Sequence, residues 1–169
     1  YRWFRNSRIQ SLLPSLDKRK KWLTVIDRLG APGDALITAN VIRCIKEKYS
    51  NLKINCITPH PELIRLDPCI DSINDKESFY SFDSSYWELI VRKETRQNII
   101  AHNLSRLDLD EYEYQAKFHL SEEEKNWAKQ HMGDLPKPII AICTQSKEVV
   151  KNWPLQNWIE LINFISSDF

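Results

Sequence analysis

The sequence predicts an α/β fold built on a parallel sheet. An apolar run at 22–26 enters a glycine-containing turn at 28–34, and a run with helical spacing at 35–49 leaves it. A second apolar run follows at 52–57, and a strand, a helix and a strand in this order form a parallel unit. With 169 residues, 42% of them hydrophobic, the chain is long enough to bury about 70% of its extended surface. We therefore expect a Rossmann-like parallel sheet with helices on both faces.

Apolar spacing predicts the elements of the first half. Ile37, Val41, Ile45 and Tyr49 recur every four residues, which indicates one apolar helix face packed against a sheet. The alternating run that forms the second strand ends at a proline-rich loop. The elements expected next are a short helix at 61–66, a small strand at 70–73, a fourth strand at 87–91 and a helix at 96–107.

The second half predicts two helices and one strand. Ser121 and Glu124 have the spacing of a reciprocal helix cap, so a helix is expected at 121–133. Residues 139–143 form a fully apolar run, typical of a strand buried in a parallel sheet. A helix with proline near its first position is expected from 153. The breaker-rich segment 136–138 separates the two series and predicts a domain boundary.

The first 21 residues are strongly basic. They hold seven Lys and Arg side chains and one aspartate, so they carry +6 and the remaining residues −5. A short helix ending before Pro14 is expected within them. This segment is either a solvated extension that packs on the body of the protein or a contact with an anionic membrane face. Nucleic acid is disfavoured as a partner, because no nucleic-acid-binding motif accompanies the cluster.

Composition and spacing exclude several classes of protein. No apolar run approaches the roughly 20 residues that span a bilayer, and no signal peptide is recognisable, so a cytoplasmic location is expected. The four cysteines, Cys44, Cys56, Cys69 and Cys143, match neither metal-ligand spacing nor a disulfide framework, which predicts reduced, buried thiols. The chain starts without Met and stops inside a helical pattern, so we expect it to be part of a longer protein.

The turn at 28–34 carries the strongest functional signal. Two of the chain's three glycines, Gly30 and Gly33, lie there, where positive φ or close approach to a ligand requires them. Their spacing fits neither the dinucleotide fingerprint nor an ATPase phosphate loop. Asp34 follows where the helix begins, so its carboxylate is either a helix cap or a group presented to a substrate.

Three motifs, in order, resemble glycosyltransferase family 9, the ADP-heptose lipopolysaccharide heptosyltransferases. They are Arg28-Leu-Gly-Ala-Pro-Gly-Asp34 with the helix that follows it, Asp67-Pro-Cys-Ile-Asp71, and Lys151-Asn-Trp-Pro with the helix that follows it. The resemblance implies the N-terminal half of a GT-B fold plus the start of the second Rossmann-like domain. From this resemblance we expect three parts: a basic extension at 1–21, an acceptor domain at 22–135, and a linker with the start of the donor domain at 136–169. We expect the remainder of the donor domain to be absent from this sequence.

The resemblance also implies an inverting transfer of heptose, or a related sugar, from an ADP-sugar to a lipopolysaccharide-type or other glycan or glycolipid. In that reaction Asp34 is the general base, and Lys151, Thr144 and Ser146 bind the donor phosphates. The implied acceptor-binding residues are Arg28, Gly33 and His60. No metal or cofactor is implied, and the enzyme is expected to be cytoplasmic, with peripheral contact at the inner face of the membrane.

The same residues are also compatible with other roles. A non-catalytic Rossmann-like module would use Asp34 only as a cap. Arg28 fits a structural salt bridge as well as an acceptor contact, and Lys151 fits a solvated surface position. A nicotinamide-dependent dehydrogenase is disfavoured, because the third glycine is missing and no acidic residue ends the second strand.

Overall fold

The structure is a computed structural model that describes residues 9–94, 96–109, 115–135, 139–146 and 149–167. Two compact units divide the chain, residues 1–124 and residues 125–169. The domain boundary predicted at 136–138 lies outside the described residues and stays a prediction.

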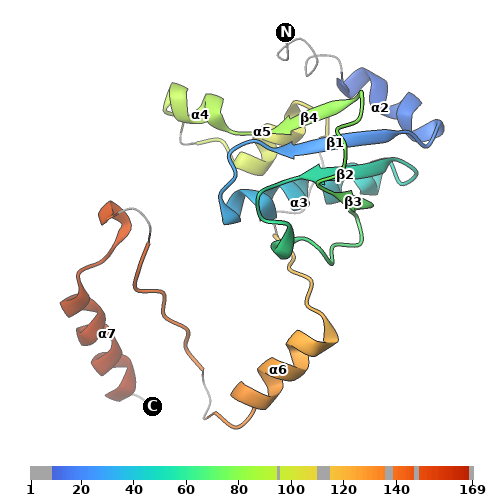
Figure 1. The fold of residues 1–169 in the computed structure, drawn as a ribbon. Helices are drawn as coiled ribbons and strands as arrows, with labels where there is room; N and C mark the ends of the chain where they lie inside the picture. The colour runs from blue at the N-terminus through green and yellow to red at the C-terminus, as the bar shows by residue number, and fades with distance from the viewer. Residues whose placement is uncertain (1–8, 95, 110–114, 136–138, 147–148, 168–169) are drawn as a thin grey trace. The chain divides into compact units, whose positions relative to one another are not determined.

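The first unit is built on a four-stranded, all-parallel sheet with strand order β3-β2-β1-β4 (Figure 1). The strands are β1 (Trp22–Asp27), β2 (Lys53–Ile57), β3 (Ser72–Ile73) and β4 (Ser81–Ser84). In the centre of the sheet Val25 is in register with Cys56 on one side and Phe82 on the other, and all three are fully buried. The predicted parallel, Rossmann-like α/β sheet is therefore confirmed.

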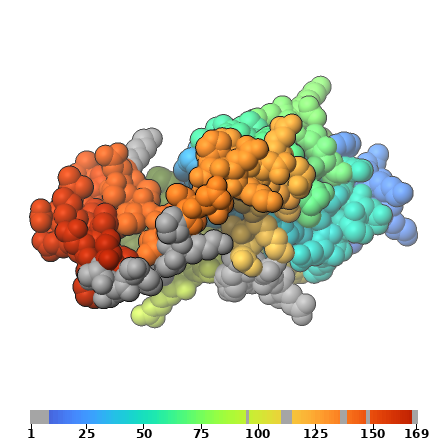
Figure 2. All heavy atoms as spheres, turned by 90° about the horizontal axis from the view of Figure 1, so that it is seen from below, coloured from blue at the N-terminus to red at the C-terminus, as the bar shows by residue number. Residues whose placement is uncertain are grey.

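Helices surround this sheet. They are α2 (Ile9–Lys18), α3 (Pro32–Lys48), α4 (Trp87–Arg92) and α5 (Ile99–Ser105), with one 3-10 turn, η1 (Pro61–Leu63). Helix α3 packs against both β1 and α5, which explains why it is buried on more than one side. In the space-filling view the blue to green segments, from α2 to β4, pack closely against one another (Figure 2).

The fourth strand is not where the apolar pattern predicted it. Residues 87–91 belong to α4, in which Leu89 is buried while Trp87 and Val91 are 58% and 64% exposed. The sheet instead takes the more polar segment Ser81–Ser84. The serine at its end is buried and accepts a hydrogen bond from the Thr38 hydroxyl at 2.9 Å, which satisfies its polar group inside the fold.

The N-terminal helix continues through Pro14 instead of ending before it. Ile9, Leu13 and Leu16 are almost completely buried in the core. A proline inside a helix removes one backbone hydrogen bond, and here tertiary burial of the apolar face outweighs that loss. Residues 9–18 are thus part of the folded body, so their removal would expose core surface and destabilise the unit.

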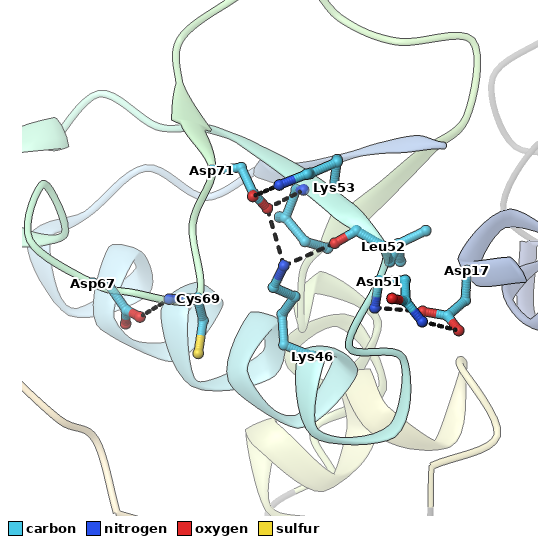
Figure 3. A network of polar contacts seen from close by, with 9 residues as sticks. Asp17, Lys46, Asn51, Leu52, Lys53, Asp67, Cys69 and Asp71 are labelled. Carbon is cyan, nitrogen blue, oxygen red and sulfur yellow. Dashed lines mark hydrogen bonds and ion pairs between the residues drawn. The ribbon is translucent and has the colours of Figure 1, made fainter. Parts of the chain in front are cut away.

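The Asp67–Asp71 motif serves the fold. The Asp67 carboxylate accepts from the Cys69 amide at 2.9 Å and pairs with buried Arg43 at 3.2 Å. Asp71 accepts from the Ile54 amide and pairs with two lysines, Lys46 at 3.1 Å and Lys53 at 2.8 Å (Figure 3). These contacts tie the start of β2 to helix α3 and to the segment before β3.

The second unit contains most of α6 (Glu122–Met132), the 3-10 turn η2 (Val149–Lys151) and α7 (Leu155–Ser167). The reciprocal cap at the start of α6 is confirmed, since Ser121 and Glu124 exchange backbone-to-side-chain hydrogen bonds of 2.7 and 3.1 Å. The prediction of a strand at 139–143 is wrong. These residues have no regular structure and lie exposed, because no other described strand pairs with them.

All four cysteines are free thiols, as predicted, but they are not all buried. Cys44 and Cys56 are buried, Cys69 is partly buried and Cys143 is exposed. Burial and the nearby charges of two aspartates raise the pKa of Cys56 to about 12, so this thiol stays protonated at neutral pH.

Candidate functional site

Loops at the carboxyl ends of β1, β2 and β4 form the candidate site. The buried Asp27 carboxylate, at the end of β1, accepts from the Gly30 amide and the Thr58 hydroxyl, both at 2.9 Å. Gly30 has φ of +73°, and a Cβ there would lie 3.2 Å from the Pro59 ring. A glycine is therefore required here by backbone conformation and by close contact between the two loops. Ligands of open parallel sheets bind at this edge.

Asp34 lies in the first turn of α3, which starts at Pro32, earlier than the sequence pattern predicts. One carboxylate oxygen, Oδ2, accepts from the Ala31 amide at 3.1 Å, and the other, Oδ1, accepts from the Tyr86 hydroxyl at 2.8 Å. The capping contact expected on one interpretation is thus present, although Asp34 occupies the third helical position and not the cap itself. The residue is 8% exposed.

The loop after β4 places Tyr86 against Asp34, and helix α5 holds this loop. The Ser85 amide donates to the buried Asn103 side chain at 2.9 Å, and the Arg106 guanidinium donates to the Ser85 carbonyl at 3.2 Å. Burial, the hydrogen bond to Asp34 and the charges of two aspartates raise the pKa of Tyr86 to about 12. Its hydroxyl is therefore protonated, and donates, throughout the physiological pH range.

Gly33 is exposed and surrounded by open space. A Cβ built on it meets nothing within 4 Å, and its φ is not in the left-handed region. Neither sterics nor backbone conformation requires a glycine here, although glycine is an unfavourable residue in a helix. The missing side chain leaves open space at the exposed surface of the first turn of α3.

Arg28 and His60 lie in the same two loops. Arg28 forms an ion pair of 2.5 Å with Asp83 on β4, so the structural salt bridge considered from sequence is present. The His60 ring lies 3.2 Å from the Glu62 carboxylate, and its backbone amide donates to the Thr58 hydroxyl. The fold thus brings the four predicted first-unit residues to the carboxyl edge of the sheet, with Arg28 and His60 each engaged by an acidic neighbour.

The other predicted residues lie in the second unit, and all three are exposed. The Ser146 amide donates to the Asn152 side chain at 2.5 Å, which joins the loop containing Thr144 to the segment just after Lys151. Helix α7 begins four residues after Lys151, and the Pro154 carbonyl accepts from its first turn. Hydroxyls, a lysine and a helix N-terminus of this kind favour a bound phosphate.

The sequence model of glycosyltransferase family 9 (heptosyltransferase) matches residues 80–168, which is more than half of the chain. The chain belongs to glycosyltransferase family 9. The matched part of this glycosyltransferase includes β4, Tyr86, α5 and the Lys151 loop, and it begins after the Asp34 turn. Neither the comparison with curated proteins nor that with solved structures gives a match.

A family 9 glycosyltransferase implies a nucleotide-sugar donor and a glycan acceptor, and the parallel sheet is consistent with the GT-B arrangement. Among the described residues, no three or more His, Cys, Asp or Glu side chains are grouped to hold a metal ion. Within the same ranges, no helix has both the length and the apolar character that crossing a bilayer requires.

Three residues that build the candidate site were not predicted from the sequence: Asp27, Tyr86 and Asn103. Asp27 ends an apolar strand, and an acidic residue at that point was a usable signal for the carboxyl edge. Tyr86 and Asn103 carried no signal, because only the fold brings the loop after β4 between α5 and α3.

Proposed function

We propose that this protein transfers a heptose or a related sugar from an ADP-sugar to a lipopolysaccharide-type glycan or glycolipid, with inversion at the anomeric carbon. Family membership supports the reaction class. The observation that carries the mechanism is the Asp34 carboxylate, which lies in the first turn of α3 and is held by the Ala31 amide and the Tyr86 hydroxyl.

In the proposed step, the acceptor hydroxyl oxygen attacks the anomeric carbon from the face opposite the leaving group. The new carbon–oxygen bond forms as the bond to the diphosphate breaks, and the bonding electrons leave with ADP. Asp34 accepts the hydroxyl proton on a carboxylate lone pair that its hydrogen bonds to Ala31 and Tyr86 leave available. Arg28 and His60 contact the acceptor. In the structure both side chains pair with acidic neighbours. To bind the acceptor, each must either leave its acidic neighbour or contact the neighbour and the acceptor together.

Lys151 neutralises the donor diphosphate, together with the hydroxyls of Thr144 and Ser146 and the N-terminus of α7. Charge builds up on the diphosphate as it leaves, so a fixed cation stabilises the transition state more than the ground state. The loop geometry around Asn152 supports this role, because it holds the hydroxyl segment close to the lysine segment.

Calorimetry of the complete protein against a panel of nucleotide sugars tests the proposal. We expect an ADP-sugar to bind and to give a glycosylated product with a lipopolysaccharide core acceptor. Binding of another nucleotide sugar, with none for ADP-sugars, would overturn the donor assignment. No binding of any nucleotide sugar would favour the non-catalytic module.

Gly33→Ala separates acceptor binding from folding. Alanine is compatible with the helical backbone at this position and should raise the free energy of unfolding by about 0.5 kcal/mol or slightly more. The new methyl group fills space proposed for the acceptor, so KM for the acceptor should rise roughly 10-fold or more. Thermal unfolding and steady-state kinetics measure the two effects.

Donor affinity of the same variant is the internal control, since Gly33 lies in the first unit and the donor-binding residues in the second. A stabilised Gly33→Ala protein with unchanged acceptor KM would remove Gly33 from the acceptor site.

We also propose that the exposed cluster at 18–21, together with the preceding arginines, contacts an anionic membrane. Each basic residue near such a surface contributes about 1 kcal/mol. Changing Lys18, Arg19, Lys20 and Lys21 to Gln should weaken binding to anionic lipid vesicles at least 100-fold at low salt, as a sedimentation assay measures. This substitution is preferable to truncation, because α2 contributes core residues.

The matched control for the cluster removes four exposed charges elsewhere, at Arg92, Lys93, Arg96 and Lys129. Equal losses of vesicle binding in the two variants would mean that total charge, and not this cluster, is responsible. Unchanged binding in the cluster variant would reject the membrane contact.

A further inference from the structure

The Asp34 carboxylate is held by donors from two separate elements. The Ala31 amide, at the start of α3, binds Oδ2, and the Tyr86 hydroxyl, in the loop after β4, binds Oδ1 at 2.8 Å. Each carboxylate oxygen has two lone pairs, so each keeps one for another donor. Two donors, one on each oxygen, restrict rotation of the carboxylate plane.

We propose that Tyr86 is a positioning residue for Asp34, whose hydroxyl orients the carboxylate to accept a proton from the acceptor. This inference rests on the proposed role of Asp34 as general base. A catalytic group must be within about 3 Å of the reacting proton and correctly oriented. Small errors in such placement reduce the rate up to about 100-fold.

Tyr86 is itself fixed by contacts that lead away from the site. The neighbouring Ser85 donates its amide to Asn103, which is fully buried on α5. Arg106 donates to both the Ser85 carbonyl and the Asn103 side chain at 3.2 Å, and it lies over the buried Phe82 ring. The loop before α4 is therefore attached to α5 and to β4, and it presents the phenol to α3.

The state of the phenol agrees with a donor role. Burial and the two carboxylates, Asp34 and Asp27, raise the pKa of Tyr86 to about 12. A phenol with that pKa stays protonated at neutral pH and is a poor base. Tyr86 thus donates to Asp34 and does not compete with it for the acceptor proton.

Tyr86→Phe in the complete protein tests this assignment, because it removes only the hydroxyl. We expect kcat to fall roughly 10-fold to 100-fold, with KM for both substrates unchanged within about twofold. The melting temperature should change little, since water can reach the half-buried site and replace the lost donor. Tyr80→Phe is the matched control, because Tyr80 precedes β4 at the opposite end of the same strand. It should keep normal kcat.

A double variant separates this inference from the proposed function. If Tyr86 acts through Asp34, adding Tyr86→Phe to Asp34→Asn should lower the residual kcat no further. An inactive Asp34→Asn protein with a fully active Tyr86→Phe protein would overturn the inference and leave the base assignment standing. Multiplicative losses in the double variant would also overturn it, since Tyr86 would then act independently of Asp34. A fully active Asp34→Asn protein would instead reject the proposed base.

Discussion

Asp34→Asn is expected to lower turnover of the complete protein roughly 100-fold to 10,000-fold, the usual contribution of a positioned general base. The amide has nearly the shape of the carboxylate but cannot take up a proton at neutral pH. Steady-state turnover at saturating donor and acceptor measures this loss without interference from substrate affinity.

The contacts of Asp34 make asparagine a suitable probe. Its side-chain oxygen can accept from the Ala31 amide, while its NH2 group donates to the Tyr86 oxygen, so both hydrogen bonds can be retained with one reversed. Only the charge near the helix N-terminus is lost, which costs about 0.3 to 1 kcal/mol. A small change in melting temperature with a large loss of turnover is the expected pattern.

Asp17→Asn is the matched control for this charge removal. Asp17 also accepts a backbone amide, that of Asn51 at 2.8 Å, but it belongs to α2 and contacts the turn before β2 (Figure 3). Its removal should leave turnover unchanged. If Asp34 is only a cap, Asp34→Ala would lose about 1 kcal/mol of stability and both Asp34 variants would remain active. An active Asp34→Asn enzyme would end the proposed mechanism.

Lys151→Ala is expected to reduce kcat/KM for the donor roughly 100-fold to 1,000-fold, comparable to the loss of one group that stabilises developing negative charge. Both donor affinity and kcat should fall, because a phosphate contact acts in the ground state and more strongly in the transition state. Lys151→Arg should keep only part of the wild-type kcat/KM for the donor, since a guanidinium differs from an ammonium in shape and reach. Calorimetric donor titration and initial rates measure the two components.

Lys129→Ala is the control for Lys151, because it removes an exposed lysine of the same unit from α6. Its kinetics should be normal. Normal kinetics for Lys151→Ala with every nucleotide sugar tested would remove this loop from the phosphate site, whatever the outcome at Asp34.

Several elements were predictable because their patterns are local. The strand 22–26, the helix face of Ile37, Val41 and Ile45, and the second strand all have periodicities that arise within one element. The reciprocal cap of Ser121 and Glu124 depends on residues three positions apart. Such features need no distant partner, and the structure confirms them.

The fourth strand shows where local patterns fail. It was predicted at 87–91, which forms helix α4, and it lies at 81–84. A short, mainly apolar run is equally compatible with a strand and a buried helix, and Trp87 to Val91, with Glu88 as its one charged residue, lies in a helix with exposed apolar side chains. The strand β4 lies at the edge of the sheet beside β1, and three of its four residues are polar. It is accepted there because the Thr38 hydroxyl and the Arg28 amide bond the serine at its end.

The sequence alone therefore determined the parallel α/β class, the glycine turn with Asp34 and the resemblance to a glycosyltransferase, because each depends on neighbouring residues. Tertiary structure decided which partners the Asp34 carboxylate has. Tyr86 lies 52 positions away and approaches Asp34 only because β4 pairs with β1, while α5 holds the loop that follows β4. Contacts between residues so distant in sequence leave no periodic signal, since they exist only once the chain has folded.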